Sequence, residues 1–285
     1  MRFPSLLCLR GNLVVIGKQP DGDSIRFVPD TPELLDSLRR SFRIRRSSDG
    51  SVQLRLEGID APETHYGALA QPLGAEARDA LLDLCGFREI RREGEEVVAA
   101  TPERRPTAIL SELVDANGRP VCILLVDQAL PDGEYVEVDE ETLRRSANTA
   151  LLGDGSAYLT LYDSCAPPIR AVLREIAADA RERRFGVWGR DETAAFELVD
   201  QESIGPDGQL VLPKLFRRCS DYLRTRAPGE TLADWLRTHG PPERPEDDQA
   251  VVGGSRETRL SEIVEQRGTT IEFPVDLLDI VFVEK

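Results

Sequence analysis

The decisive stretch of this sequence is Leu54-Arg55-Leu56-Glu57-Gly58-Ile59-Asp60-Ala61-Pro62-Glu63. Apolar and polar residues alternate from Val52 to Ile59, which predicts a half-buried strand. Asp60 and Glu63 follow on a turn that Pro62 makes rigid. Three residues apart on a fixed turn, the two carboxylates are predicted to face one pocket.

A third carboxylate lies upstream. Asp21-Gly22-Asp23-Ser24 opens a second alternating run, so Asp23 stands at the start of another strand. Three carboxylates at strand ends suit a hard cation such as Ca²⁺, which prefers oxygen ligands. Arg55 precedes Asp60 by five residues and is predicted to point into the same site. The competing interpretation is two ordinary surface turns, because Asp-Gly and Asp-Ala-Pro are common turn sequences.

Five blocks of the sequence follow one another in a specific order. They are Asp21–Ser24, Arg55–Thr64, Asp115–Arg119, Asn148–Ala157 and Leu173–Trp188. In this order they resemble the staphylococcal nuclease family, also called thermonucleases. The family has Asp-Gly-Asp-Thr at the first block and Arg-Leu-x-x-x-Asp-Thr-Pro-Glu-Thr at the second. The order of the blocks is more specific than any single one of them.

The resemblance implies a metal site. Asp23 and Asp60 would be direct Ca²⁺ ligands, and the backbone carbonyl of Ala61 would be a third. The family has Thr where Ala61 stands. Because only the carbonyl is needed for the metal, the difference should matter little there.

The resemblance also implies a reaction. Glu63 would hold or deprotonate the attacking water, while Arg55 and Arg119 would bind the phosphate and stabilise the charge that develops on it. The planar fork of guanidinium groups suits this task. The expected function is Ca²⁺-dependent hydrolysis of DNA and RNA with 3′-phosphate products. The alternative is a non-catalytic nucleic-acid-binding or protein-interaction module on a nuclease-like scaffold; retention of all five charged site residues argues against it.

The expected fold class is α+β. Residues 1–190 are predicted to form a five-stranded OB-fold Greek-key barrel with helices, as the resemblance implies, with an insertion at 29–50. Residues 191–285 show a different pattern and are predicted to be a smaller, separately packed α/β accessory region. Helices are predicted at 71–84, 140–152, 168–184, 214–225 and 231–238. Strands are predicted at 87–98, 108–114, 121–126, 196–199, 250–252 and 280–283.

The formal charge of −15 is unusual for a protein that contacts nucleic acid, since phosphate contacts normally need a basic face. The acidic excess is larger after Arg190 than before it. This balance predicts weak, metal-dependent contact with nucleic acid. The one dense basic cluster lies in the insertion and consists of Arg39, Arg40, Arg43, Arg45 and Arg46. It is either a solvated surface or a patch that follows phosphates.

Five widely spaced cysteines without a Cys-x-x-Cys pair predict free, buried thiols in a reducing compartment. No apolar run approaches the roughly 20 residues of a membrane helix. The apolar start of the chain is too short for a signal peptide. The sequence therefore predicts a cytoplasmic protein without a membrane partner. Tyr158, Tyr162 and Trp188 are predicted to pack in the core.

Overall fold

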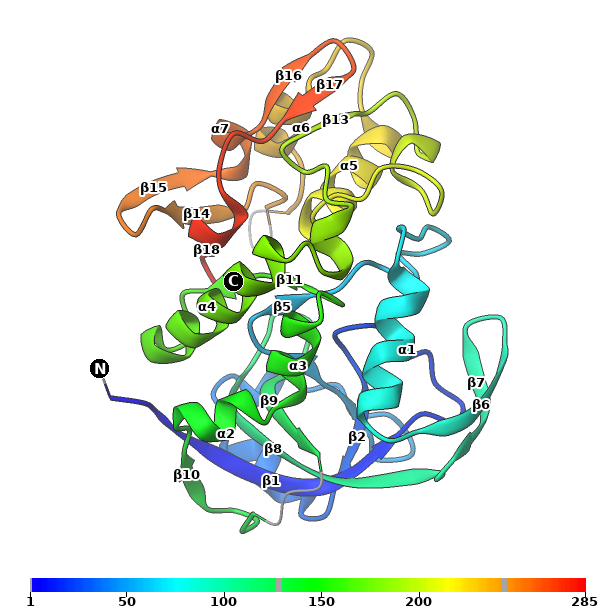
Figure 1. Cartoon of the computed structure of the whole chain (residues 1–285), viewed down its shortest axis with the longest axis vertical. Coiled ribbons are helices and arrows are strands. Elements are labelled where there is room, and N and C mark those ends of the chain that lie inside the picture. Colours follow the sequence, from blue (N-terminus) through cyan, green and yellow to red (C-terminus); the bar gives the residue numbers. More distant parts are fainter. Residues whose placement is uncertain (1, 127–129, 242–244) are drawn as a thin grey trace.

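A computed structural model describes residues 2–126, 130–241 and 245–285 (Figure 1). Its largest sheet has seven strands in the order β3-β2-β1-β8-β9-β4, with β10 beside β1. These strands are β1 (Ser5–Val14), β2 (Arg26–Pro29), β3 (Val52–Gln53), β4 (Arg55–Leu56), β8 (Arg104–Val114), β9 (Pro120–Val126) and β10 (Tyr135–Glu137).

The sheet is nearly closed into a barrel by one short segment. β3 and β4 stand at opposite ends of the strand order, yet only Leu54 separates them in sequence. β3 pairs antiparallel with β2, while β4 pairs parallel with β9, with Arg55 opposite Val121. The prediction of a mixed fold with a barrel-like sheet is confirmed. The sheet has seven strands instead of five, because this segment counts twice and β10 adds an edge; the OB-fold assignment stays a prediction.

Helices cover one side of the barrel: α1 (Gly74–Leu84), α2 (Glu140–Arg144), α3 (Ala147–Gly153) and α4 (Pro167–Glu182). The predicted helix at 140–152 is two helices, because Ser146 caps the second by accepting from the Thr149 amide. Asn148 fixes α3 to the sheet. Its Oδ1 accepts from the Leu124 amide at 2.9 Å, and its Nδ2 donates to the carbonyls of Glu57 and Cys122.

Two separate two-stranded sheets lie in the same part of the chain. β6 (Arg88–Glu93) pairs with β7 (Glu96–Thr101), and β5 (Ile59–Asp60) pairs with β11 (Tyr158–Leu159). The turn before Arg119 is a three-residue loop, because the Asp115 amide donates to the Arg119 carbonyl. Gly118 there has φ +83°, and a Cβ would meet the Arg43 carbonyl at 2.3 Å.

Residues 191–285, called the C-terminal half below, form a second layer of short strands and helices, drawn from yellow-green to red in Figure 1. It contains β13 (Ala195–Glu197), α5 (Pro213–Thr225), α6 (Leu232–Thr238), β14 (Gln249–Val252), β15 (Arg256–Arg259), α7 (Leu260–Ile263), β16 (Glu265–Arg267), β17 (Thr270–Glu272) and β18 (Ile280–Phe282). Short 3-10 helices are η1 (Pro32–Ser37), η2 (Ser41–Arg43), η3 (Gly186–Gly189), η4 (Glu202–Ile204) and η5 (Leu277–Asp279).

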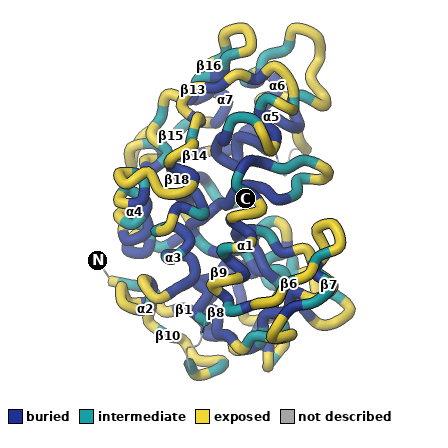
Figure 2. The backbone as a smooth tube through the Cα atoms, turned by 45° about the vertical axis from the view of Figure 1, so that its right-hand side comes forward, coloured by how far each residue is buried: buried dark blue, intermediate teal, exposed yellow. Residues whose placement is uncertain are grey.

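The two halves share one core, which differs from the separate packing predicted for residues 191–285. The buried apolar side chains form one continuous cluster that reaches from the barrel to α5 and β18. β12 (Leu161–Tyr162) pairs parallel with β18. In Figure 2, buried segments accordingly lie on both sides of the contact between the barrel part and the C-terminal half. The reason is the apolar face of α5, whose Leu215, Phe216 and Cys219 are fully buried. The boundary at residue 190 itself stays a prediction.

Four of the five arginines of the insertion make side-chain contacts within the chain. Arg39 pairs with Glu112 and Arg46 with Asp36. Arg40 and Arg43 both donate to the backbone carbonyl of Lys285, at 2.9 and 3.1 Å. These contacts favour the interpretation as an ordinary surface over a free phosphate patch.

Two further observations concern the chain as a whole. All five cysteines are buried and free. Among the helices in the described ranges, none has the length and apolar character that crossing a membrane requires.

Candidate active site

Asp60 is the last residue of β5 and is fully buried. The loop that carries Asp23 lies against the turn that follows it. A Cβ added to Gly22 would lie 2.6 Å from the Cβ of Ala61, so this close approach requires glycine. Gly22 thereby brings Asp23 to the side of Asp60, as the sequence predicts.

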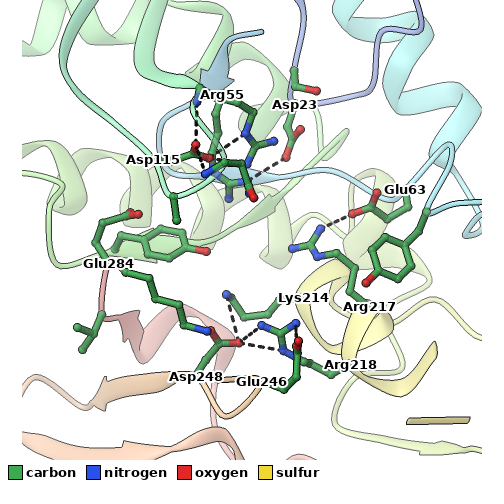
Figure 3. A pocket seen from close by; sticks show the side chains of 18 of the residues that line it. Asp23, Arg55, Glu63, Asp115, Lys214, Arg217, Arg218, Glu246, Asp248 and Glu284 are labelled. Atoms are coloured by element: carbon green, nitrogen blue, oxygen red, sulfur yellow. Dashed lines mark hydrogen bonds and ion pairs between the residues drawn. The ribbon is translucent and has the colours of Figure 1, made fainter. Parts of the chain in front are cut away.

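Arg55 lies within 4.0 Å of both carboxylates, and Figure 3 shows it beside Asp23. Its Nη1 is 4.0 Å from Oδ2 of Asp23, and its Nη2 is 3.9 Å from Oδ1 of Asp60. The guanidinium also lies over the ring of Tyr162, 5.6 Å from the centroid. Burial raises the pKa of Asp23 to about 6, although Arg55 acts in the opposite direction. Arg55 is thus held at the site by two acids and a ring.

Glu63 is held by the N-terminal end of α1. Its amide donates to Oε1 of Gln71, and its carbonyl accepts from the Gln71 amide at 2.9 Å. Gly74 packs so closely that a Cβ would lie 2.4 Å from the Glu63 carbonyl oxygen. Burial raises the pKa of the Glu63 carboxyl to about 7, whereas Arg217 acts to lower it. A carboxyl with this pKa is partly ionised at neutral pH, which suits a general base.

Arg119 lines the same pocket but is fastened to Asp115. Its Nε and Nη2 both lie 2.8 Å from Oδ2 of that carboxylate, and its amide donates to Oδ1. Asp115 therefore fixes the side chain of Arg119 while leaving it about a fifth exposed. The structure thus brings Arg119 to the pocket that also contains Asp23, Arg55 and Glu63.

A residue that the sequence interpretation missed occupies the middle of the site. Arg217, from α5, donates from Nη2 to Oδ2 of Asp60 at 2.8 Å and from Nη1 to Oδ1 at 3.3 Å. The same Nη1 donates to Oε1 of Glu63. Burial alone would raise the pKa of Asp60, but Arg217 and Arg55 outweigh it and hold that pKa below its usual value. Both predicted site acids of the turn are therefore neutralised by an arginine from the other half of the chain.

The opposite wall of the pocket is centred on Asp248, which is almost fully buried (Figure 3). Three cations surround its carboxylate: Arg218 at 2.9 Å, Lys285 at 2.8 Å and Lys214 at 3.6 Å. Burial raises the pKa of Asp248, yet the three cations outweigh it and lower that pKa well below the usual range. Lys214 also lies over the ring of Phe282, 4.4 Å from the centroid.

The two walls enclose a pocket of about 390 Å³. Its lining comes from the Asp21–Ser24 loop, from the segment 55–66, from the turn at Asp115–Arg119, from Tyr162, from α5, from residues 245–248 and from the residues that follow β18. The pocket is polar and mixed in charge. It lies within the size range of small-ligand sites, so a nucleotide-sized group fits.

Three acids at the site are candidate ligands for a metal ion. Asp23, Asp60 and Glu63 offer the hard oxygens that Ca²⁺ prefers. Within the described residues, however, no group of three or more His, Cys, Asp or Glu side chains is arranged to hold a metal. Arg217 instead bonds both oxygens of Asp60 and one of Glu63. A single and a double positive charge 4 Å apart repel by about 8 kcal/mol at an effective dielectric constant of about 20, so the two cations exclude each other.

Comparison with known families agrees with this geometry. Residues 53–190 match the family model of the staphylococcal nuclease homologues. This part of the chain is therefore a staphylococcal-nuclease-like domain. The match includes Arg55, Asp60, Glu63 and Arg119; Asp23 and the C-terminal half lie outside it. A search of curated proteins found no match to the chain.

One signal in the sequence pointed to the missed residues. Lys214, Arg217 and Arg218 stand at positions i, i+3 and i+4 of a helix whose other face is apolar. This spacing predicts a shared polar face. It does not say which acids that face meets, because Asp60 and Glu63 lie more than 150 residues away in sequence. Tyr158 is buried as predicted and donates to Asp191, whereas Tyr162 lines the pocket.

Proposed function

We propose that this protein is a nuclease that hydrolyses phosphodiester bonds of DNA and RNA and leaves 3′-phosphates. The observation that carries the proposal is the common pocket of Arg55, Glu63 and Arg119, with Asp23 beside them. A base and two guanidinium groups around one pocket are what phosphoryl transfer by water needs. The family match over residues 53–190 supports the same reaction class.

In this proposal the three residues have separate tasks. Glu63 accepts a proton from the attacking water, a role supported by its pKa of about 7. Arg55 and Arg119 donate hydrogen bonds to the non-bridging oxygens of the phosphate and stabilise the charge that develops there. Asp115 contributes by keeping Arg119 in a fixed orientation, which lowers the entropy lost on binding substrate.

Calcium belongs to the proposal under one condition. Asp23, Asp60 and the carbonyl of Ala61 would hold the ion once Arg217 has left the Asp60 carboxylate. When bound, the ion would supply positive charge next to the phosphate. Without that rearrangement both carboxylate oxygens of Asp60 remain hydrogen-bonded to Arg217.

The substrate that fits best is a single strand. A pocket of about 390 Å³ between two walls accepts one nucleotide with its phosphates but not both strands of a duplex. A cytoplasmic location stays a prediction, resting on the five buried free thiols.

The test is hydrolysis of circular single-stranded DNA and of unstructured RNA by the purified full chain, at millimolar Ca²⁺ and in excess chelator. We expect linear fragments with 3′-phosphate ends at millimolar Ca²⁺. The Glu63→Gln variant, prepared identically, controls for contaminating nucleases. Binding without cleavage would favour the non-catalytic module, and equal cleavage in chelator would remove calcium from the proposal while leaving the nuclease in place.

A further inference from the structure

The cation of this site is part of the chain itself. We propose that Arg217 is the resident cation of the Asp60–Glu63 site and that a divalent metal ion binds these carboxylates only by displacing it. The inference deepens the proposed function, on which it rests for the identity of the competing ion. It does not depend on whether the protein cleaves nucleic acid.

The contacts of Arg217 carry the argument. Its two terminal nitrogens bond both oxygens of Asp60, and one of them also bonds Glu63. This bidentate arrangement is the strongest geometry for a hydrogen-bonded guanidinium and carboxylate. Asp60 is fully buried, so the carboxylate gains no comparable partner from solvent. A metal ion that needs the same oxygens has to remove the guanidinium first.

The helix that carries Arg217 is fixed on both sides of it. Leu215, Phe216 and Cys219 are fully buried in the shared core. Asp221 accepts a 2.6 Å hydrogen bond from the hydroxyl of Tyr66, three residues beyond Glu63. The ring of Tyr66 also meets that of Phe216 edge-on, with centroids 6.4 Å apart. The position of Arg217 is therefore set by packing, and only its side chain has to turn to release the acids.

The charges around the site explain why a resident cation is needed. Asp23, Asp60 and Glu63 are three acids in one buried place, and Arg55 is the arginine that their own half of the chain places between Asp23 and Asp60. Like charges held together disfavour ionisation. Arg217 supplies a positive charge from the other half, and it faces the pocket into which it can withdraw. A metal ion could supply the same positive charge, but it would have to enter the site from solvent.

The experiment measures metal binding without substrate. Ca²⁺ is titrated calorimetrically into the full-length protein and into Arg217→Gln, with Tb³⁺ luminescence as a second readout. If only about 1–10% of wild-type molecules have Arg217 withdrawn, its apparent affinity is reduced by that fraction. We therefore expect Arg217→Gln to bind Ca²⁺ about 10–100-fold more tightly. Its melting temperature should fall without Ca²⁺ and recover with it.

Two control variants make the result specific. Arg218→Gln removes the same charge from the same pocket, but its contacts are with Asp248 and Glu246; we expect less than a twofold change in Ca²⁺ affinity. In the double variant Arg217→Gln with Asp60→Asn, the gained affinity should disappear. Equal affinity of wild type and Arg217→Gln would overturn the proposal, as would a gain that survives Asp60→Asn.

The wild-type protein keeps the proposal testable even if Arg217→Gln does not fold. A displaced ligand implies weak binding, so the wild-type dissociation constant should be weaker than roughly 10⁻⁴ M, the weak end of the range for oxygen-ligand sites. Micromolar or tighter binding by the wild type, lost in Asp60→Asn, would contradict competition by Arg217. Cleavage assays do not enter this test, so an inactive protein still decides it.

Discussion

The two walls of the pocket are built from the same kinds of side chain in opposite proportion. On the nuclease wall, the acids Asp23, Asp60 and Glu63 outnumber Arg55, the base between them. On the C-terminal wall, the carboxylate of Asp248 is surrounded by three cations, one of which, Arg218, also pairs with Glu246. Arg217 belongs to α5 on the C-terminal wall, but its side chain bonds Asp60 and Glu63 on the nuclease wall. Each wall thus supplies the charge that the other lacks, and the site is complete only when both are present.

The largest test of this comparison is to remove one wall. A fragment that ends at Asp191 loses α5 and β18, whose buried apolar side chains belong to the shared core. Each such side chain contributes about 1.5–3 kcal/mol, so a few of them equal the whole stability of a typical domain, about 5–15 kcal/mol. We expect an aggregated or unfolded fragment by size-exclusion chromatography and circular dichroism. Co-expression of residues 192–285 should restore solubility.

A soluble, monodisperse fragment with a cooperative melting transition near that of the full chain would contradict this expectation. It would return the C-terminal half to a separately packed accessory region. The two walls would then belong to two units that fold independently and only touch at the pocket.

The second test asks whether the chemistry belongs to the nuclease wall. Glu63→Gln and Arg119→Ala should each lower turnover on single-stranded DNA at least about 100-fold, the usual scale for a base or for a donor to the developing charge. The stability effects should differ, because Glu63 is buried and paired with Arg217 whereas Arg119 is about a fifth exposed. Thermal melting should therefore shift more for Glu63→Gln. A folded variant with near wild-type turnover would exclude that residue from catalysis.

The third test addresses the C-terminal wall through pH. The folded-state pKa of Asp248 is lowered by Lys214, Arg218 and Lys285, against burial. A lowered pKa means that the ionised carboxylate stabilises the fold above its ordinary value of 3.8, and that this stability is lost as pH falls towards the folded pKa. Asp248→Asn should cost about 3 kcal/mol of unfolding free energy at pH 7, because it leaves buried cations unpaired.

Denaturant melts at pH 7 and below pH 3 check this prediction, since the difference between Asp248→Asn and the wild type should shrink at the lower pH. If the difference in unfolding free energy were the same at both pH values, the charge of the Asp248 carboxylate would not contribute to stability. Glu272→Gln, on the half-buried strand β17, provides a control that removes one acid outside the pocket.

The smallest effect is expected at the insertion. Replacing Arg39, Arg43 and Arg45 by Gln should change the slope of log binding constant against log salt by less than roughly 0.7, the value for one phosphate contact on a single strand. The reason is that Arg39 is occupied by Glu112 and Arg43 by the Lys285 carbonyl. A decrease of about 1.4 or more would show that at least two of these arginines bind phosphates and that the pocket has a third basic surface.

The sequence predicted the nuclease wall far better than the other one. Asp60, Glu63 and Arg55 lie within ten residues, so a strand, a turn and a rigid Pro62 suffice to place them near each other. Alternation and helical periodicity also predicted most elements, including α6, which is expected at 231–238 and spans Leu232–Thr238. Arg217 could not be paired with Asp60 in the same way, because that contact depends on how α5 packs on the barrel. Local pattern determines elements, whereas contacts between distant residues follow from packing.

The segment that closes the barrel has a consequence for how the site can be observed. The amide of Leu54 donates to the Ile25 carbonyl, and the amide of Leu56 donates to the carbonyl of Asp23. Between them, Arg55 pairs with the far edge of the sheet at Val121. These two amides can exchange with deuterium only when the seam opens, and that same event removes Arg55 from its acids. Their exchange rate therefore measures how often Arg55 leaves the candidate site.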